Sequence, residues 1–354
     1  MLSSLSGYAQ EITDTTVVNV AYGVQSSKTQ SAAISTVKGE RLMEITSPTV
    51  GNSLKGMLPG LSILQKSGEP GYDFYMENMF TRGVSSFNSK QQMLVFVDGF
   101  EAPLDNISAE EIESVSLLKD AAALAIYGSR GANGVLLITT KKGYHSSPKI
   151  GFRMQTGIQM PTIMDTPMDA YNYARLYNQA LENDGKAALY TNEALAAYQS
   201  GSNQYLYPNV NWKNQLYKNT TPLTMSELSF RGGGGGLNYY VMAGLMHNDG
   251  IYRGTDSKQR ENANVNYARY NFRANLDVDI TKYFRTFLYS GVSFAEKTTP
   301  GAGGADDYLK SVWTTPPNAF PVYNPNGSFG GTSLYTNPVA NLLNGGLYLS
   351  LIHI

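Results

Sequence analysis

The feature that most constrains the fold is a pair of long segments in which apolar and polar side chains alternate without a break. Residues 269–280 carry aromatic and aliphatic side chains on one face, whereas the other face carries Arg269, Asn271, Arg273, Asn275, Asp277 and Asp279. A period of two fits a β-strand and no helix. The turn Thr281-Lys282 leads at once into a second segment of this kind, residues 283–294. The chain therefore contains a hairpin of unusually long strands.

The length of these strands favours a membrane-spanning barrel over a soluble sandwich. Strands of soluble sheets usually have ~5–6 residues, whereas tilted strands that cross a bilayer have ~9–11. Residues 150–159, 223–231 and 237–247 alternate in the same way, and short turns at one end with long connections at the other are typical of outer-membrane barrels. An arginine facing lipid costs ~2–4 kcal/mol, so we expect the Arg269 and Arg273 face to look into a water-filled lumen.

The composition agrees with a β-rich exported protein and excludes several classes. Charged residues make up 16% of the 354 residues, and there are 35 Gly, 25 Tyr and no Cys. The net charge of −1 disfavours nucleic-acid binding, and the lack of Cys excludes disulfides and cysteine nucleophiles. It also fits an oxidising compartment. No apolar run reaches the ~18 residues of a membrane-spanning helix.

Residues 41–143 are predicted to form a compact α+β unit. A helix is expected near residues 49–57, and strands over 92–97, 114–118 and 135–140, with a helical turn over 121–127. Ser108 and Glu111 have the spacing of a capping box, which predicts a short helix over 109–113. Residues 144–354 then hold the long strands, and a helical and loop insertion is expected at about 160–222, with helices over 169–181 and 193–198.

The first 40 residues have no core of their own. Gly7, Tyr8 and Ala9 form a small-x-small triplet, so residues 1–9 are interpreted as the remnant of a signal peptide, with an unstructured start as the alternative. Residues 10–40 are expected to form an extended, detachable arm. No turn residues flank its valine cluster, so no hairpin is expected there.

None of the glycine, histidine or carboxylate patterns predicts an enzyme, a cofactor or a metal site. No Lys-Ser/Thr follows the five glycines 232–236, which excludes a Walker loop and favours a loop tip between strands. Gly128, Gly131 and Gly134 lack the strand before and long helix after that a dinucleotide site needs. The three His residues are isolated in the sequence.

The stretch LLKDAAALAIYGSRGANGVLLITTKKG, residues 117–143, resembles the plug-domain signature of TonB-dependent outer-membrane transporters of the SusC/RagA branch. Thr81-Arg82-Gly83 and QMLVFVDGF (92–100) resemble further plug elements in the same order. The resemblance implies an α+β plug domain followed by antiparallel transmembrane β-barrel strands. It marks as signature residues Arg82, Gly83, Asp98, Gly99, Lys119, Asp120, Tyr127, Gly128, Arg130, Gly131, Asn133 and Gly134.

The resemblance also implies location and partners. TTVVNVAYGVQ (15–25) resembles the TonB box, whose usual form has an acid where two threonines stand here, and the box-like residues are Thr15, Thr16, Val17, Val18, Asn19 and Val20. TonB would capture this arm by strand addition and pull part of the plug aside. A SusD-like surface lipoprotein would cover the barrel in the outer-membrane lipid, with plug and arm toward the periplasm.

The cargo implied by the resemblance is a large nutrient, an oligosaccharide or a peptide. Aromatic side chains pack on both, and the candidates for substrate contact are Tyr72, Phe74, Tyr75, Trp212, Trp313 and Tyr323. A siderophore or cobalamin receptor of the same fold is one alternative, and a secreted β-rich binding or adhesin module is another.

The number of strands is too small for a closed barrel. Five or six are expected here, whereas plugged transporters close with about 22. An open edge in lipid leaves backbone groups unsatisfied, and we therefore expect the chain to be a fragment of a longer protein with an incomplete barrel.

Overall fold

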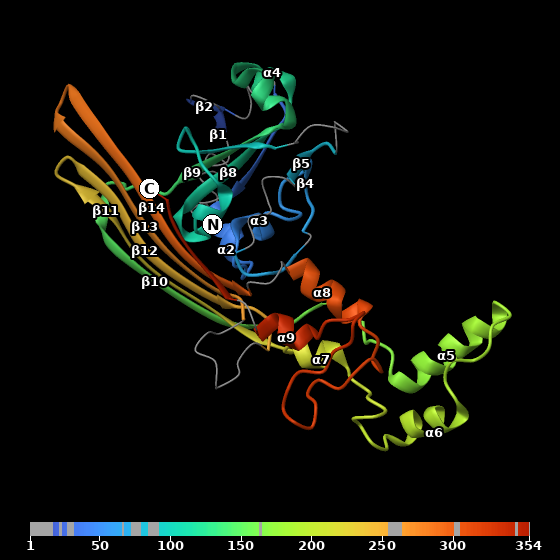
Figure 1. Ribbon diagram of the computed structural model, residues 1–354. Helices are drawn as coiled ribbons and strands as arrows, with labels where there is room; N and C mark the ends of the chain where they lie inside the picture. Colours follow the sequence, from blue (N-terminus) through green and yellow to red (C-terminus); the bar gives the residue numbers. More distant parts are fainter. Residues whose placement is uncertain are drawn as a thin grey trace, which may run out of the picture.

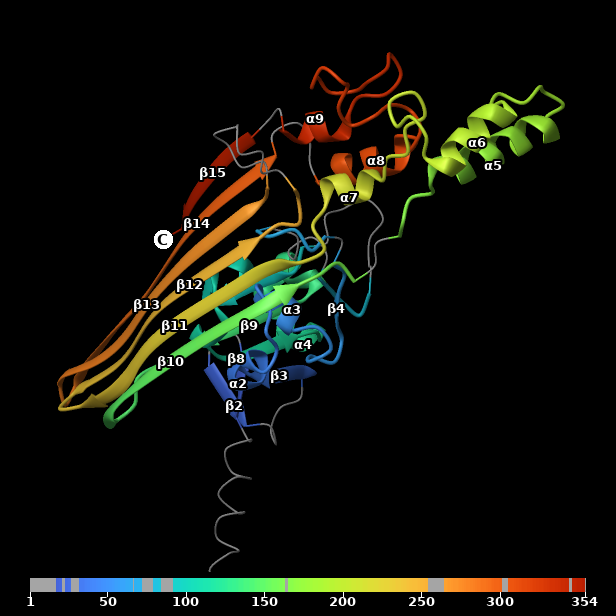
Figure 2. The same cartoon turned by 90° about the horizontal axis from the view of Figure 1, so that it is seen from below.

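The computed structural model describes residues 17–20, 23–26, 32–65, 67–71, 79–83, 92–162, 165–253, 264–300, 305–343 and 346–353. A long antiparallel sheet curves around a smaller mixed sheet, and helices lie beyond one end of the long strands (Figures 1 and 2). The expected α+β plug and antiparallel barrel strands are both present.

The smaller sheet has the order β3 (Ile34–Lys38), β8 (Ile112–Leu118), β9 (Val135–Thr140), β6 (Leu94–Val97) and β7 (Phe100–Glu101). Only β6 and β9 pair in parallel within it. The sheet takes in β3, which lies upstream of residue 41, where the plug unit is predicted to begin; the division of the chain into domains stays a prediction.

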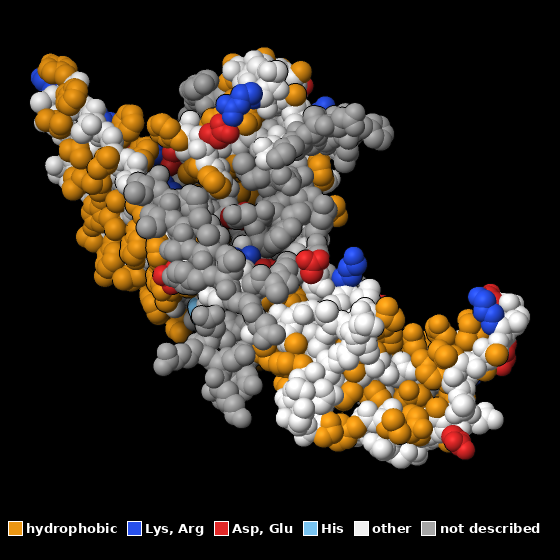
Figure 3. Space-filling view, in the orientation of Figure 1, with side chains coloured by type: hydrophobic (Ala, Val, Ile, Leu, Met, Phe, Trp, Pro, Cys, Tyr) orange, Lys and Arg blue, Asp and Glu red, His pale blue; other side chains and the backbone are white. Residues whose placement is uncertain are grey.

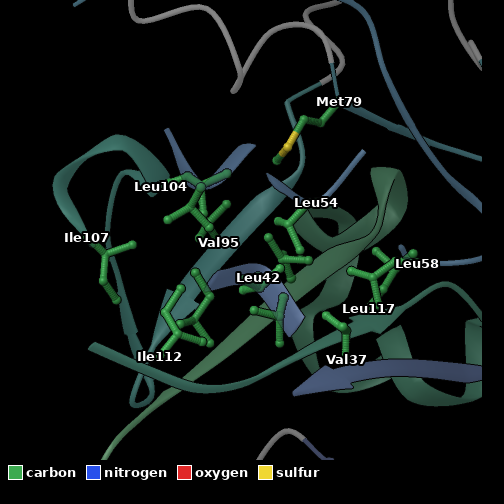
Figure 4. Packing of buried hydrophobic residues seen from close by; sticks show 14 of the residues in the cluster. Val37, Leu42, Leu54, Leu58, Met79, Val95, Leu104, Ile107, Ile112 and Leu117 are labelled. Atoms are coloured by element: carbon green, nitrogen blue, oxygen red, sulfur yellow. The ribbon is translucent and has the colours of Figure 1, made fainter. Parts of the chain in front are cut away.

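The core of the plug lies between this sheet and two short helices, α2 (Gly39–Met43) and α3 (Val50–Ser53). Leu42 and Leu54 are fully buried against Val95 and Leu117 of the sheet (Figure 4). A two-stranded sheet of β4 (Leu61–Ile63) and β5 (Met79–Thr81) adds Met79 to the same cluster. Burying each large apolar side chain contributes roughly 1.5–3 kcal/mol, so this cluster makes a large contribution to the plug's own stability.

Local signals in the sequence set most of the plug elements. The strand predicted over 135–140 coincides with β9, and the capping box of Ser108 and Glu111 is present at the 3-10 helix η3 (Ala109–Glu111). This helix ends before residue 113 because β8 begins at Ile112. The helix predicted over 49–57 ends at Ser53 and continues only as turns. The remaining helical turns are η2 (Leu104–Asn106), α4 (Ala121–Leu124) and η4 (Ala125–Asn133).

The arm contains a hairpin, contrary to the expectation of an extended segment. β1 (Val17–Val20) pairs antiparallel with β2 (Gly23–Ser26), with Val20 opposite Gly23. β-branched residues favour strands, and the two residues that separate the strands are the commonest length of a hairpin loop. The lack of strong turn residues around the valines therefore does not prevent a hairpin, because two residues are enough to connect its strands. Thr15 and Thr16 lie outside the described residues.

The long sheet runs in chain order through β10 (Ser146–Gln159), β11 (Thr221–Gly234), β12 (Leu237–Asp249), β13 (Asn266–Thr281), β14 (Phe284–Pro300) and β15 (Gly346–His353). Two connections are two residues long, Gly235-Gly236 and Lys282-Tyr283, and both lie at the same end. Both glycines have positive φ, +62° and +90°, which type I′ hairpin turns require. The first three glycines of the run belong to β11.

Alternation along the long strands produces two unlike faces. The outer face is covered by hydrophobic side chains (Figure 3); Ile150, Phe152 and Ile158 are 70%, 70% and 74% exposed there. On the opposite face Arg269, Asn271 and Asn275 of β13 are buried, and Arg269 is only 5% exposed, whereas Asp279 near the short turn is exposed. The expectation of a wet lumen at this face is therefore wrong for β13, because the plug occupies that space.

In the described residues, the helices beyond the end with the long connections are α5 (Ala170–Asn183), α6 (Asn192–Ser200), α7 (Trp212–Leu216), α8 (Ala305–Thr314) and α9 (Pro338–Leu343). The side chains of Asp169 and Thr191 cap the N-termini of α5 and α6. Helices α7, α8 and α9 share a core with Tyr217, Tyr252 and Phe320, whereas α5 and α6 protrude from the body (Figures 1 and 2). None of the helices in the described ranges is long and apolar enough to cross a membrane.

Candidate functional site

The plug is fastened to the long sheet by a ladder of polar side chains on β13. Arg269 donates to the carbonyl of Asp105, and Asn271 Nδ2 donates to the carbonyl of Asn106 at 2.6 Å. These residues alternate with lipid-side residues such as Phe272, so one strand presents an unbroken polar row to the plug.

The ladder continues toward the short turns. Arg273 Nε donates to Glu111 Oε2 at 2.5 Å, and Asn275 Nδ2 donates to Thr140 Oγ1 at 2.7 Å and to the carbonyl of Lys141 at 2.8 Å. These four side chains of β13 therefore bind either the plug segment 105–111 or the end of β9 and the residue that follows it.

Glu111 is the centre of this contact. Its side chain is 2% exposed and accepts from the Ser108 backbone N–H at 3.0 Å and from Asn271 Nδ2 at 3.1 Å, in addition to Arg273. A buried carboxylate is stable only when it is paired and hydrogen-bonded. The helix cap, which serves the plug's own folding, thus places the carboxylate that binds the wall.

Strands β11 and β12 make a second set of contacts with the same part of the plug. Tyr240 Oη donates to the carbonyl of Glu110 at 3.0 Å, and Glu227 is hydrogen-bonded to the Ser108 hydroxyl. Arg231 donates to the carbonyl of Lys142 at 2.6 Å. The segment 105–113 and the end of β9 are therefore held by three neighbouring strands.

The predicted signature residues Asp98 and Gly99 form the turn next to this contact. Asp98 has φ +49° and accepts from the Thr140 backbone N–H at 3.0 Å and the Thr140 hydroxyl at 2.5 Å. Arg273 Nη1 lies 3.8 Å from the Asp98 carboxylate. Gly99 has φ +91°, a conformation that L side chains rarely adopt.

Lys119 and Asp120 hold the start of the plug sheet. Lys119 Nζ donates to Ser35 Oγ and to the carbonyl of Pro59, both at 2.6 Å. Asp120 Oδ2 accepts from the Ala33 N–H at 3.3 Å. Lys119 therefore joins β3 to the loop before β4, and Asp120 holds the residue just upstream of β3.

The remaining signature residues lie directly after β5 or in the turns before β9. Asn133 accepts from the Thr81 hydroxyl at 2.7 Å through its carbonyl, the Tyr127 ring lies 5.2 Å from that of Phe96, and Arg130 pairs with Glu101 at 2.6 Å on an exposed surface. The backbone of Arg82, Gly83, Gly128 and Gly134 has positive φ. A side chain on Gly131 would come within 2.8 Å of Tyr127 Cβ. These contacts are structural, and a gating role for the signature stays a prediction.

The aromatic candidates for substrate contact are placed very differently. Trp313 is 47% exposed and Tyr323 is 45% exposed, both on the side of the long connections. Trp212 is only 1% exposed, packs against the tilted ring of Phe320 at 5.4 Å between centroids, and donates its indole N–H to the carbonyl of Pro316 at 3.2 Å. The core that α7, α8 and α9 share with Tyr217, Tyr252 and Phe320 is here called the core of the helical cap. The prediction that Trp212 contacts the substrate is wrong, because its ring belongs to this core. Tyr72, Phe74 and Tyr75 lie outside the described residues.

Trp313 lines a hollow of about 770 Å³ between the plug and the long connections. On the plug side the lining is the loop of residues 67–70, and on the barrel side it includes Met160, Asp249 and Tyr252. Lys297 of β14 fixes the loop through Glu69 at 3.0 Å and through the carbonyl of Gly71 at 3.2 Å. A pocket of this size, bounded by an aromatic ring and a few polar groups, suits a small-molecule or oligomeric ligand.

The site residues that sequence reasoning missed are the plug partners of the β13 row. The sequence pattern indicates that the polar side chains of β13 share one face, but it does not indicate that this face meets the plug rather than water. No group of three or more residues suited to hold a metal occurs in the described part of the chain.

Comparison with known proteins adds to this geometry. Residues 26–135 match the family model of the TonB-dependent receptor plug domain. The chain is 28% identical to TonB-dependent receptor P26 of Formosa agariphila, over 92% of this chain and 31% of the relative. It is 27% identical to TonB-dependent receptor SusC of Bacteroides thetaiotaomicron, over 77% of this chain and 26% of the relative.

A solved structure of the RagAB peptide importer in a closed-closed state superimposes with a TM-score of 0.63, at 25% identity, over 87% of this chain and 35% of the matched chain. The same importer in an open-open state gives a TM-score of 0.68 over 91% of this chain. The chain spans 26% to 38% of the length of these relatives. The family is one of outer-membrane transporters and not of enzymes. The chain therefore belongs to the SusC/RagA-type TonB-dependent receptors, of which it comprises the plug domain and some of the strands that follow it.

Proposed function

We propose that the protein takes part in TonB-dependent import of large nutrients, oligosaccharides or peptides, across the outer membrane. The observation that carries the proposal is the polar contact between the plug and β13, in which Glu111 and Arg273 are paired and almost fully buried. A plug bound inside the curve of a lipid-facing sheet closes the passage until it rearranges.

The position of the arm supports its proposed role as the TonB-binding segment. β2 lies on the same side as the short turns of the long sheet, and α5 to α9 lie on the opposite side (Figures 1 and 2). In barrels of this class the short turns face the periplasm, where TonB would reach Val17–Val20. Because β1 and β2 already pair with each other, capture by strand addition requires β1 to leave β2 or a free edge of the hairpin to accept the partner.

The proposed lid is a surface lipoprotein of the SusD type over the helical side. Trp313 of α8 lines the hollow between the plug and the long connections, which supports cargo binding there. Cargo would be held between the loop 67–70 of the plug and the long connections, so its binding and the position of the plug would be linked.

The experiment uses the full-length receptor. Pull-down with the C-terminal domain of TonB should succeed with the intact arm and fail after deletion of residues 15–26, while deletion of the α5–α6 hairpin (170–200) serves as a control that keeps TonB binding. Equal capture with and without the arm would contradict the role of the arm.

A second experiment identifies the cargo. A strain that lacks the whole receptor gene, here called the deletion strain, is grown on glycans, on peptides or on chelated iron as the limiting nutrient. A growth defect on chelated iron alone would contradict the proposed cargo.

A further inference from the structure

A separate hollow of about 490 Å³ lies in the helical cap, and its lining has an unbalanced charge. Its lining includes Gln215, Lys218, Arg253 and Tyr323, together with Val339 and Leu343 of α9. Among the residues that the structure describes, two cations and no carboxylate line this space, although the whole chain has 27 basic and 28 acidic residues. The hollow therefore has a local excess of positive charge.

The fold fixes the backbone of both cations. Tyr217 and Tyr252 form an antiparallel bridge, and their rings, 4% and 5% exposed, lie 5.4 Å apart in the core of the cap. Beside this bridge the Lys218 N–H donates to the carbonyl of Ile251 at 2.6 Å, and the Arg253 N–H donates to the carbonyl of Leu216 at 2.8 Å. Two buried tyrosines thus hold Lys218 and Arg253 next to each other.

The charged ends of these side chains are available for a ligand. Arg253 donates through Nε to the carbonyl of Tyr217 at 2.7 Å, which orients the guanidinium group. Within the described part of the chain, neither its terminal nitrogens nor Lys218 Nζ has a hydrogen-bond or ion-pair partner, although Lys218 is half-buried. Lys297, in contrast, is neutralised by Glu69. An oriented guanidinium with free terminal N–H groups is suited to bind a carboxylate or sulfate at two points.

An aromatic ring adjoins the two cations. Tyr323 is half-exposed, and its ring lies 5.1 Å from that of Phe329, with which it also forms a backbone bridge. The ring is therefore held in place with one side accessible. A rigid sugar ring loses less conformational freedom than a flexible peptide when it packs on a fixed aromatic face. A sugar ring with an anionic group therefore suits this ring and the cationic pair beside it better than a peptide does.

We propose that this hollow binds an acidic sugar residue of the cargo, a uronic acid or a sulfated sugar. Arg253 and Lys218 hold the anionic group, and Tyr323 packs against the sugar ring. This inference rests on the proposed import function and names one class of cargo, acidic oligosaccharides.

Binding is measured by calorimetry on the full-length receptor in detergent. The ligands are a galacturonic acid tetrasaccharide, a sulfated galactose tetrasaccharide, the uncharged galactose tetrasaccharide and a tetraglutamate peptide. Variants K218Q and R253Q each remove one cation, K218R keeps the charge, and K310Q removes an exposed cation of α8 that does not line the hollow.

One or both acidic sugars should bind at least about tenfold more tightly than the uncharged sugar, and added salt should reduce this preference. We expect K218Q and R253Q each to weaken binding of the acidic sugar by roughly fivefold or more, while K218R and K310Q stay near wild type. Y323A should weaken binding of every sugar. The two acidic ligands distinguish a carboxylate from a sulfate as the preferred group.

Other outcomes separate this inference from the proposed function. Equal affinity for charged and uncharged sugars, or an acidic preference that survives K218Q and R253Q, would overturn the anion site while leaving import intact. Tighter binding of tetraglutamate than of either acidic sugar would overturn the assignment to sugars. If the deletion strain shows no uptake defect on any glycan or peptide, the proposed function itself fails.

Discussion

Arg273 of β13 donates to the carboxylate of Glu111 at 2.5 Å and joins the barrel wall to the plug through a pair that is almost fully buried. Removing one partner of such a pair leaves an uncompensated charge and typically costs about 3–5 kcal/mol. The R273M variant of the full-length receptor should therefore loosen the plug. We expect faster proteolysis of the plug and a higher ion conductance in planar bilayers.

A matched control is R285M. Arg285 pairs with Asp279 at 2.6 Å, but both side chains are largely exposed, at 62% and 44%. Exposed pairs contribute little because water and salt screen them, so conductance should stay at the wild-type level. Equal behaviour of R273M and R285M would contradict the role of the buried pair.

The two tryptophans should respond in opposite ways to truncation. Trp212 is buried against Phe320 in the cap, and Trp→Ala in a core costs about 3–5 kcal/mol. W212A should therefore lower the unfolding temperature of the cap in scanning calorimetry. W313A should leave stability nearly unchanged and reduce cargo affinity, because Trp313 lines the hollow beside the plug. A loss of cargo affinity in W212A without any loss of stability would contradict this division.

The polar row of β13 illustrates what a sequence can and cannot predict. Alternation along residues 269–280 determines which side chains share a face, because successive residues of a strand point to opposite sides. It does not determine what fills the space opposite. The polar row was expected to meet water and meets the plug instead, since its partners lie about 130–165 positions away in the chain.

Local elements were predictable where their signals are local. The capping box needs only residues 108–111, and β9 is a run of β-branched and aliphatic residues bounded by Gly134 and by lysines. Burial of Trp212 depends on Pro316 and Phe320, about a hundred residues away, and no pattern near residue 212 indicates it. For the arm, the bounds of β1 and β2, and with them the spacing of two residues, become known only from the structure.

Gly134 should not tolerate a side chain. Its φ is +97°, and an added Cβ would lie 2.6 Å from Thr81 Cγ2. G134A should destabilise the plug by about 1–3 kcal/mol through backbone strain and by more through this clash. The measurement is hydrogen exchange of the β9 amides. The control G157A, at a position with open space and an ordinary φ, should leave exchange unchanged.

Tyr217 makes the stability of the helical cap depend on alkaline pH. Burial raises the pKa of its phenol from 10.0 to about 12, because the charged phenolate is poorly solvated in the core of the cap. The folded pKa is higher than the unfolded value, so the folded state holds the proton more tightly. This contribution is fully present below pH 10 and is lost as the pH rises toward 12. The unfolding temperature of the wild-type cap should fall over this window, and Y217F should fall less. An identical pH dependence of the two proteins would show that another group causes the loss.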